Sequence, residues 1–136
     1  MAEKKIVVVD DDDIIRKTFF MILHKKYSVY LAKDAEEALC RFQREDIDLI
    51  ITDLKLPRLS GLEMIAAFRK NGYKGDVILI SAYPDLLQKD DLRRFSIEYF
   101  FIKPLDLKAL EQSIDSLIRS EGSQSKKYGI QPCTKR

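Results

Sequence analysis

The sequence predicts an α/β domain in which five parallel strands form a sheet with helices on both of its faces. Five short apolar runs alternate along the chain with segments whose apolar residues recur about every 3.6 positions. Such alternation is typical of a parallel sheet, because the chain must cross back over the sheet between successive strands. Four of the five runs end in charged or hydroxyl side chains. With 136 residues, 46% of them hydrophobic, the chain can form one domain with a real core.

The first half of the chain is predicted to contain three strands and two helices. The strands are residues 6–9, residues 27–31 and the apolar run that ends at Asp53. Asp13 is expected to cap the first helix, and Asp34 with Glu37 has the pattern of a capping box at the start of the second. The apolar faces of these helices contain Ile15, Phe19 and Ile22, and Ala35, Ala38, Leu39 and Phe42.

The second half of the chain supplies the other two strands, which are predicted at residues 77–80 and 99–102. Ser60 and Glu63 form another capping-box pattern, and the helix they begin is expected to end near Gly72. Asp106 is expected to cap the last and most regular helix. Its apolar face contains Leu107, Leu110, Ile114, Leu117 and Ile118.

The helix between the fourth and fifth strands has the least regular pattern. Pro84 and Asp85 are suited to start a helix. The apolar residues that follow are unevenly spaced: Leu86, Leu87, Leu92 and Phe95. A helix is expected here, but one with a poorly defined buried face.

The last 17 residues have a different composition from the rest of the chain. Residues 120–136 contain four basic residues and one acidic residue, and they lack apolar periodicity. They are predicted to form a flexible basic tail after a domain that comprises residues 1–119. The basic charge could contact nucleic acid, but a solubilising tail is the favoured interpretation.

Several function classes find no support in the composition. No apolar run approaches the roughly 18 residues of a membrane span, and the N-terminus resembles no secretory signal, so we expect a cytoplasmic protein. Cys40 and Cys133 match no metal-binding spacing and are expected to be free thiols, and His24 is expected to be a packing or surface residue. A net charge of +2 argues neither for nor against nucleic acid.

Polar residues at the ends of the predicted strands indicate a shared site. They are Asp10, Asp11, Asp53, Ser81 and Lys103. The carboxyl ends of parallel strands lie at one edge of the sheet, where α/β proteins bind ligands. Three carboxylates brought together repel one another unless a cation lies among them, and hard oxygen ligands favour Mg²⁺ over zinc.

The same residue types suit phosphoryl transfer, because a metal, a lysine and a hydroxyl can stabilise the charge of a phosphoryl group. An Asp carboxylate can act as the nucleophile in this chemistry. Asp53 is the better candidate for the acceptor, since the Asp10–Asp11 pair already supplies ligands for the metal.

These residues carry a resemblance to a known family. The chain resembles response-regulator receiver domains of two-component signalling, the family that includes the chemotaxis response regulator. The matching motifs are Val9-Asp10-Asp11, Asp53 with Pro57 four residues later, Gly61, Ser81-Ala82 and Lys103-Pro104. The resemblance covers about residues 4–119, and it implies a flavodoxin-like (βα)5 fold with strand order 2-1-3-4-5.

The resemblance also implies a metal site and a phosphoacceptor. Asp53 would accept a phosphoryl group from a phosphohistidine of a sensor histidine kinase or a phosphotransfer protein. Asp11 would bind Mg²⁺ directly, Asp10 through water, and Asp53 through its second oxygen. The backbone carbonyl of Lys55 would supply a further ligand.

Further roles implied by the resemblance concern the phosphoryl group and the signal. Ser81 would hydrogen-bond a phosphoryl oxygen, Lys103 would form an ion pair with it, and the Lys103–Pro104 peptide would be cis. Ser81 and Phe100 would be the switch residues. The protein would catalyse only its own phosphorylation and dephosphorylation, and its output would pass to a downstream protein target.

Four positions depart from the commonest family pattern or remain open. Ser60 stands where Asp is frequent, Ser81 where Thr is frequent, and Phe100 where Tyr is frequent. Ser60 can still cap a helix and Ser81 keeps a hydroxyl, whereas Phe100 loses one. Asp12 is either a solvated loop residue or a supporting member of the acidic cluster.

Two other functions remain as alternatives. A haloacid-dehalogenase-like phosphatase would use Asp10 in an Asp-x-Asp motif with Asp12, but this chain has neither its further acidic motif nor room for a cap domain. A receiver-like binding module without phosphorylation is the second alternative. Dinucleotide binding is disfavoured because the first strand-to-helix turn contains no glycine. Homodimer formation is left open.

Overall fold

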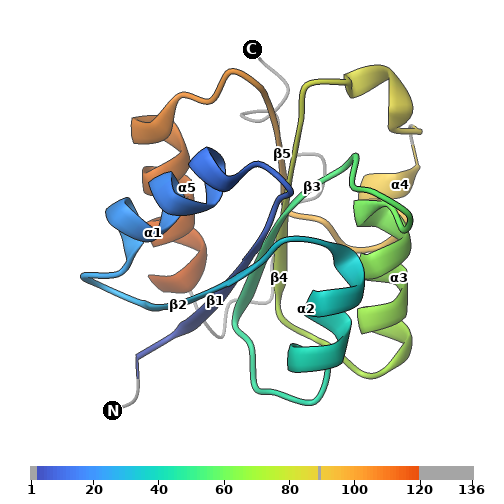
Figure 1. Ribbon diagram of the computed structural model, residues 1–136, viewed down its shortest axis with the longest axis horizontal. Helices are drawn as coiled ribbons and strands as arrows, with labels where there is room; N and C mark the ends of the chain where they lie inside the picture. The colour runs from blue at the N-terminus through green and yellow to red at the C-terminus, as the bar shows by residue number, and fades with distance from the viewer. Residues whose placement is uncertain (1–2, 89, 120–136) are drawn as a thin grey trace.

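The computed structural model describes residues 3–88 and 90–119, and within them the chain forms one parallel sheet of five strands (Figure 1). The order is β2-β1-β3-β4-β5, as the family resemblance implied. All neighbouring strands pair in parallel. The strands are β1 (Lys5–Val9), β2 (Ser28–Ala32), β3 (Leu49–Asp53), β4 (Asp76–Ser81) and β5 (Tyr99–Ile102).

The helices cover both faces of the sheet, with α1 and α5 on one side and α2, α3 and α4 on the other (Figure 1). Successive residues of a strand point to opposite faces, so each strand supplies two cores. Val7 and Val9 pack with Phe68 beneath α3, whereas Ile6 and Val8 lie in the opposite core. The helical segments are α1 (Asp13–Leu23), α2 (Ala35–Phe42), α3 (Gly61–Lys70), the 3-10 helix η1 (Pro84–Leu86), α4 (Asp91–Arg94) and α5 (Leu107–Arg119).

Three of the predicted helix caps are confirmed. The Asp34 carboxylate accepts the Glu37 N–H at 2.8 Å, and the Asp106 carboxylate accepts a backbone N–H of α5 at 3.1 Å. Ser60 and Glu63 form a complete capping box before α3. At α2 the box is only half formed, because the Glu37 carboxylate accepts the N–H of Lys33 instead of that of Asp34.

The expectation that Asp13 caps the first helix is wrong, because Asp12 does so. Asp12 has an extended backbone, and its carboxylate accepts the N–H of Ile14 at 2.9 Å. Asp13 is the first residue with helical geometry, so its side chain projects along the helix and pairs with Arg16 at 2.7 Å. In an acidic run, the residue that caps is decided by where the strand's extended backbone ends.

Strand β2 begins and ends one residue later than predicted. The N–H of Tyr27 still donates to the carbonyl of Leu23 at 3.0 Å, so Tyr27 belongs to the turn that leaves α1. Pairing with β1 then begins at Ser28 and runs to Ala32. The Tyr27 hydroxyl is used elsewhere, since it donates to the Asp115 carboxylate on α5.

The prediction of a single helix that begins at Pro84 is also wrong. The chain forms two short pieces, η1 and α4, because Leu87 after η1 has extended dihedrals of −94° and 128°. The irregular apolar spacing is the reason, since Leu86 remains 52% exposed. On α5, Leu107 is likewise exposed rather than buried, while Leu110 and Ile114 are buried.

No helix among the described residues is long and apolar enough to cross a lipid bilayer. Cys40 is an exposed free thiol. Cys133 and the predicted flexible tail, residues 120–136, lie outside the described residues.

Candidate functional site

Three carboxylates converge at the carboxyl edge of the sheet. Asp10 and Asp11 follow β1, and Asp53 is the last residue of the adjacent strand β3. Each offers a carboxylate oxygen, and these oxygens lie within 4.8 Å of one another. Asp10 and Asp53 are buried, whereas Asp11 is exposed. The convergence predicted from the strand ends is therefore present.

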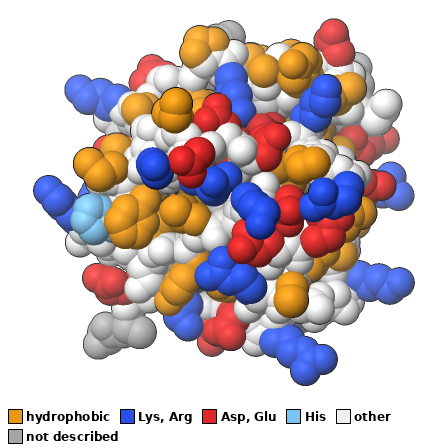
Figure 2. Space-filling view, viewed as in Figure 1, with side chains coloured by type: hydrophobic (Ala, Val, Ile, Leu, Met, Phe, Trp, Pro, Cys, Tyr) orange, Lys and Arg blue, Asp and Glu red, His pale blue; other side chains and the backbone are white. Residues whose placement is uncertain are grey.

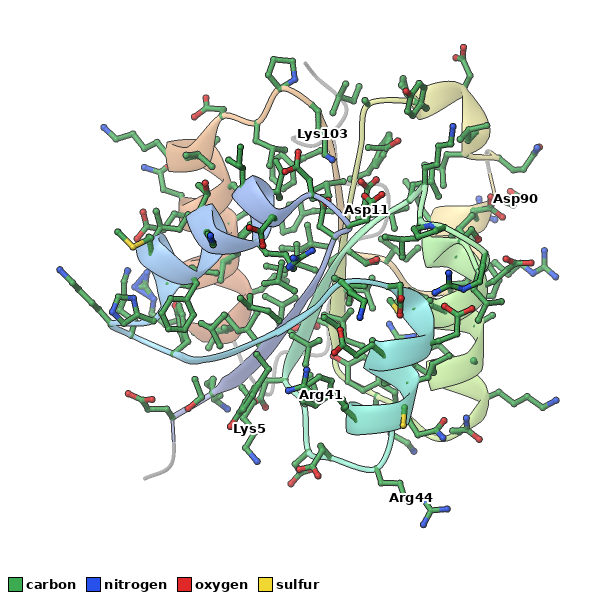
Figure 3. The ribbon with its side chains drawn as sticks, in the orientation of Figure 1. Lys5, Asp11, Arg41, Arg44, Asp90 and Lys103 are labelled. Carbon is green, nitrogen blue, oxygen red and sulfur yellow. The ribbon has the colours of Figure 1, made fainter. Side chains whose placement is uncertain are left out.

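Lys103, which follows β5, reaches the same cluster. Its ammonium group lies 2.9 Å from the Asp53 carboxylate and 3.3 Å from that of Asp10. Figure 3 shows Lys103 and Asp11 at the same edge of the sheet. Burial disfavours the ammonium charge, but the hydrogen bond to Asp53 and the charges of Asp10 and Asp53 outweigh this effect, so the pKa of Lys103 is raised.

Burial also disfavours the charged form of Asp10, whose side chain is fully buried. Desolvation of the carboxylate, with a smaller repulsion from Asp53, raises the pKa of Asp10 from 3.8 to about 6. A hydrogen bond from the Asp12 N–H at 2.9 Å and the charge of Lys103 only partly oppose this rise. The ionised form of Asp10 therefore destabilises the folded, metal-free protein.

The loop after Asp53 is tightly built. The N–H of Lys55 donates to the Asp53 carboxylate at 3.2 Å, and the N–H of Gly61 donates to the carbonyl of Leu54 at 2.8 Å. Gly61 lies so close that a Cβ atom there would collide with the backbone oxygen of Asp53 and lie 3.1 Å from the Asp53 carbonyl carbon. Glycine at position 61 thus permits α3 to begin directly against the end of β3.

A cavity of about 380 Å³ opens over this edge of the sheet. Its wall includes Asp11, Asp53 and Lys103, together with Lys55 and Tyr83. The Lys55 ammonium group lies 4.9 Å from the centre of the Tyr83 ring, a cation–π distance. The cavity therefore gives a small anionic group access to Asp53 beside two lysines.

Three predicted site residues do not line the cavity: Asp10, Ser81 and Phe100. Ser81, at the end of β4, is buried, and its hydroxyl oxygen accepts the N–H of Tyr83 at 2.7 Å. Phe100 on β5 is 5% exposed and packs in the core beneath α2, α3 and α4. The Lys103–Pro104 peptide is cis, as the resemblance implied.

Arg16 supports the site, although the sequence did not lead us to predict this role. Its guanidinium donates to the backbone carbonyl of Asp10 at 2.7 Å and to the Asp13 carboxylate at 2.7 Å. The available signal was an arginine three residues after an acidic residue in a first helical turn. Asp12, left open above, supports the same loop as the cap of α1 and as the donor of an N–H to Asp10.

The residues present fit a magnesium ion. All three side chains of the cluster are carboxylates, and its members include neither histidine nor cysteine. Mg²⁺ prefers hard oxygen ligands, whereas structural zinc sites use nitrogen and sulfur. The spacing of the carboxylate oxygens allows a single ion to contact more than one of them. The cluster therefore suits Mg²⁺ better than zinc.

Comparison with known families gives the same assignment. A sequence profile of the response regulator receiver domain matches residues 6–115. The chain belongs to the response regulator receiver family. This receiver domain is a signalling module of two-component phosphorelays rather than a classical enzyme, and the phosphatase interpretation is set aside.

Curated relatives of this receiver domain are longer proteins. The transcriptional regulatory protein HptR of Staphylococcus aureus is 30% identical over 109 residues, which are 78% of this chain and 42% of HptR. The probable transcriptional regulator ycf27 of Cyanidium caldarium is 36% identical over 93 residues, 68% of this chain and 37% of that protein. The chain thus spans less than half the length of these relatives.

Solved structures agree with the fold. TrrA of Thermotoga maritima, a response regulator solved in complex with Mg²⁺ and BeF, is 31% identical with a TM-score of 0.72, covering 84% of this chain and 98% of TrrA. The chemotaxis protein CheY4 of Vibrio cholerae is 25% identical with a TM-score of 0.75, covering 85% of this chain and 99% of CheY4. The domain is therefore similar to the chemotaxis regulator in architecture.

Proposed function

We propose that this receiver domain accepts a phosphoryl group on Asp53 from a phosphohistidine of a sensor histidine kinase or a phosphotransfer protein. The observation that carries the proposal is the position of Asp53 in the cavity wall, paired with Lys103 and adjacent to Asp10 and Asp11. Asp10 is a poorer acceptor because its side chain is fully buried and absent from that wall. Asp11 lines the cavity but is exposed, and no contact to it from Lys103 is seen among the described residues.

In the proposed reaction a carboxylate oxygen of Asp53 attacks phosphorus. An O–P bond forms while the N–P bond of the phosphohistidine breaks, and the leaving imidazole nitrogen keeps the electron pair. Lys103 pairs with the phosphoryl oxygens, and the Ser81 hydroxyl donates to one of them once it is within reach. Lys103 and Ser81 thus stabilise the negative charge that the phosphoryl group brings to the site.

The metal ligands we propose are Asp11 directly, Asp10 through water, the second oxygen of Asp53, and the backbone carbonyl of Lys55. Bound Mg²⁺ supplies positive charge that offsets the carboxylates and the incoming phosphoryl group. The carboxylates orient the site, and the Lys55 N–H holds the first oxygen of Asp53. Support comes from TrrA, a relative above 30% identity solved with Mg²⁺ and BeF.

The direct test is phosphorylation by a small phosphodonor such as acetyl phosphate. We expect magnesium-dependent incorporation of one acid-stable, base-labile phosphoryl group, because an acyl phosphate has these properties. Asp53→Asn should abolish it, and removal of Mg²⁺ with a chelator should do the same. Tandem mass spectrometry of the labelled peptide then identifies the residue.

Two results would contradict the proposal. Label on Asp10 would favour phosphatase-like chemistry. Absence of label from both the small donor and a panel of phosphorylated histidine kinases would favour a receiver-like binding module that uses the fold without phosphorylation.

A second prediction concerns the lifetime of the phosphoryl group, which we expect to be long. The Tyr83 ring and the Lys55 ammonium group stand together at the cavity wall, where the ring can screen water and the lysine can pair with phosphate. Replacing both with Ser should speed hydrolysis about tenfold, which corresponds to ~1.4 kcal/mol of barrier. The decay of purified phosphoprotein in Mg²⁺, after removal of the phosphodonor, measures this rate. An unchanged hydrolysis rate in the double variant would contradict this prediction.

A third prediction concerns transmission of the signal through Ser81 and Phe100. Phosphorylation adds about −1.5 to −2 charge and three acceptor oxygens beside β4. If Ser81 turns toward them, its contact with the Tyr83 N–H is lost, and space opens beside β5 into which Phe100 can move. The short segments η1 and α4 follow in the chain and are suited to rearrangement.

The measurement is the amide NMR spectrum with and without beryllofluoride. Shifts should extend from Asp53 and Ser81 to residues 85–110, and Ser81→Ala should reduce them. Shifts confined to the loop after Asp53 would contradict transmission through that face.

Partners and location follow from the family as proposals. The upstream partner is a histidine kinase or a phosphotransfer protein, and the downstream target is a protein that recognises the rearranged surface of α4, β5 and α5. We place the protein in the cytoplasm, where two-component phosphorelays operate. Homodimer formation stays open, and a direct role for nucleic acid is not proposed.

A further inference from the structure

One residue in the loop between β3 and α3 has an unfavourable backbone conformation. Arg58 has a φ of 66°, in the left-handed region that favours glycine and asparagine. Nothing in the covalent structure of arginine favours this region. Contacts made in the folded protein must therefore offset the cost.

The Arg58 side chain reaches across to the start of α2. Its guanidinium donates to the Asp34 carboxylate at 2.8 Å and to the Glu36 carboxylate at 3.3 Å. The face in Figure 2 carries such basic and acidic side chains interleaved. The loop after β3 is thus joined to the loop after β2, which lies two strands away in the sheet order β2-β1-β3.

Asp34 is a better partner than an ordinary surface carboxylate. One of its oxygens caps α2 by accepting the Glu37 N–H at 2.8 Å, so the side chain is held in place before Arg58 arrives. The Asp34 side chain is 10% exposed, although that of Arg58 is 62% exposed. A fixed and largely buried carboxylate loses less entropy and is less screened than a mobile one at the surface.

The position of Arg58 in its loop connects the ion pair to the site. Arg58 lies three residues after Lys55, whose backbone carbonyl is a proposed metal ligand, and three residues before Gly61, which anchors the loop to Leu54. Leu56 is buried and holds the first half of the loop against the core. In the second half, Leu59 lies at the edge of that core and Ser60 is held by its capping box with Glu63, so the ion pair of Arg58 acts on the stretch between Leu56 and Leu59.

We infer that Arg58 and Asp34 form a positioning pair that holds the phosphoacceptor loop in the conformation that presents Asp53 and the Lys55 carbonyl to Mg²⁺. The inference rests on the proposed function for its metal. Arg58 and Asp34 contact neither metal nor phosphate, and they act through the loop backbone. Without the ion pair, residue 58 leaves the left-handed region and the loop shifts.

The deciding variant is Arg58→Gln, because two explanations predict opposite signs for it. Removing a positive charge near a carboxylate cluster should tighten Mg²⁺ binding if only long-range electrostatics matter. Loss of the positioning pair should instead weaken binding, by up to about fivefold, the upper range for an exposed ion pair. The Mg²⁺ dissociation constant is measured by titration of the full chain followed by amide NMR.

Three further variants sharpen the test. Arg41→Gln removes the same charge from an ion pair with Glu37 on α2, away from the loop, and should leave the dissociation constant within error of wild type. Asp34→Asn should weaken Mg²⁺ binding as Arg58→Gln does. Asparagine still caps α2, so this variant loses the ion pair with Arg58 but keeps the cap. Arg58→Asn removes the same charge as Arg58→Gln but should bind Mg²⁺ more tightly than that variant, because asparagine adopts the left-handed region readily. Equal Mg²⁺ binding by Arg58→Asn and Arg58→Gln would show that the backbone conformation of residue 58 does not affect the site.

Binding by Arg58→Gln that equals or exceeds that of wild type would overturn the inference. A wild-type protein that binds no Mg²⁺ would instead overturn the proposed function, and hydrogen exchange then decides the positioning role by itself. The amides of Lys55 and Gly61 should exchange about fivefold faster in Arg58→Gln than in wild type if the pair holds the loop. Equal exchange would overturn it.

Discussion

Asp10→Asn should make the metal-free protein more stable at pH 7.5, although it alters the proposed metal site. The wild-type carboxylate is fully buried, and its pKa is raised from 3.8 to about 6. Since one pKa unit corresponds to about 1.4 kcal/mol, the ionised side chain costs up to ~3 kcal/mol of unfolding free energy. Asparagine keeps an acceptor for the Asp12 N–H without the charge.

The pH dependence has a definite sign. A carboxylate whose pKa is raised by folding binds its proton more tightly in the folded state, so it favours folding at low pH. The contribution of Asp10 to the unfolding free energy should therefore fall as the pH rises from about 4 to about 6, through the window between the two pKa values. This fall should be missing in Asp10→Asn, and the two proteins should converge below about pH 4.

Urea unfolding in chelator at several pH values measures this difference. Asp12→Asn is the matched control, because Asp12 is exposed and asparagine caps α1 equally well. Lower stability of Asp10→Asn than of wild type at pH 7.5 would contradict the prediction. Saturating Mg²⁺ should narrow or reverse the difference, since a ligand bound only by the folded state stabilises it.

Gly61→Ala should destabilise the protein by roughly 1–3 kcal/mol, the usual cost of overpacking. Alanine is ordinarily the better residue at the start of a helix, by at most about 1 kcal/mol. The new Cβ would collide with the backbone oxygen of Asp53 and approach the Cα atom of Leu54 at 3.1 Å, and backbone atoms cannot swing aside. The clash should therefore outweigh the gain in helix propensity.

Because the collision is with Asp53 itself, Gly61→Ala should also slow phosphorylation by acetyl phosphate. Gly75→Ala is the comparison, since a Cβ at position 75 meets the Tyr73 side chain, whose hydroxyl donates to the Asp76 carbonyl, at the amino-terminal end of β4 and away from Asp53. Thermal unfolding and phosphorylation rates of both variants measure the effect. A Gly61→Ala protein as stable as wild type, or one phosphorylated as fast as Gly75→Ala, would show that the end of β3 is freer than its contacts imply.

Much of this architecture could be predicted from local pattern. Runs such as residues 6–9 and 77–80 are apolar on both faces, which is expected only of strands covered on both sides. Capping at Asp34, Ser60 and Asp106 was predictable because each cap is an interaction over two or three residues. Convergence of the acidic residues followed from the rule that carboxyl ends of parallel strands share one edge.

The errors occurred where neighbouring positions offered equivalent local choices. Asp12 and Asp13 are chemically identical, so the point where the backbone bends decides which one caps α1. Tyr27 has a good strand propensity, but the N–H contact to Leu23 keeps it in a turn. Between β4 and β5, uneven apolar spacing left the number of helical segments undetermined.

By itself, the sequence determined the fold class, the edge of the sheet that carries the site, and the oxygen-rich chemistry of that site, because these depend on periodicity and residue type. Only the tertiary structure decided the burial of Asp10, the ion pairs of Lys103 and the contact of Arg58 with Asp34. The two contacts join segments far apart in the chain: 24 residues separate Arg58 from Asp34, and 93 residues separate Lys103 from Asp10. Their distances and desolvation follow from how the strands pack together, which no local pattern records.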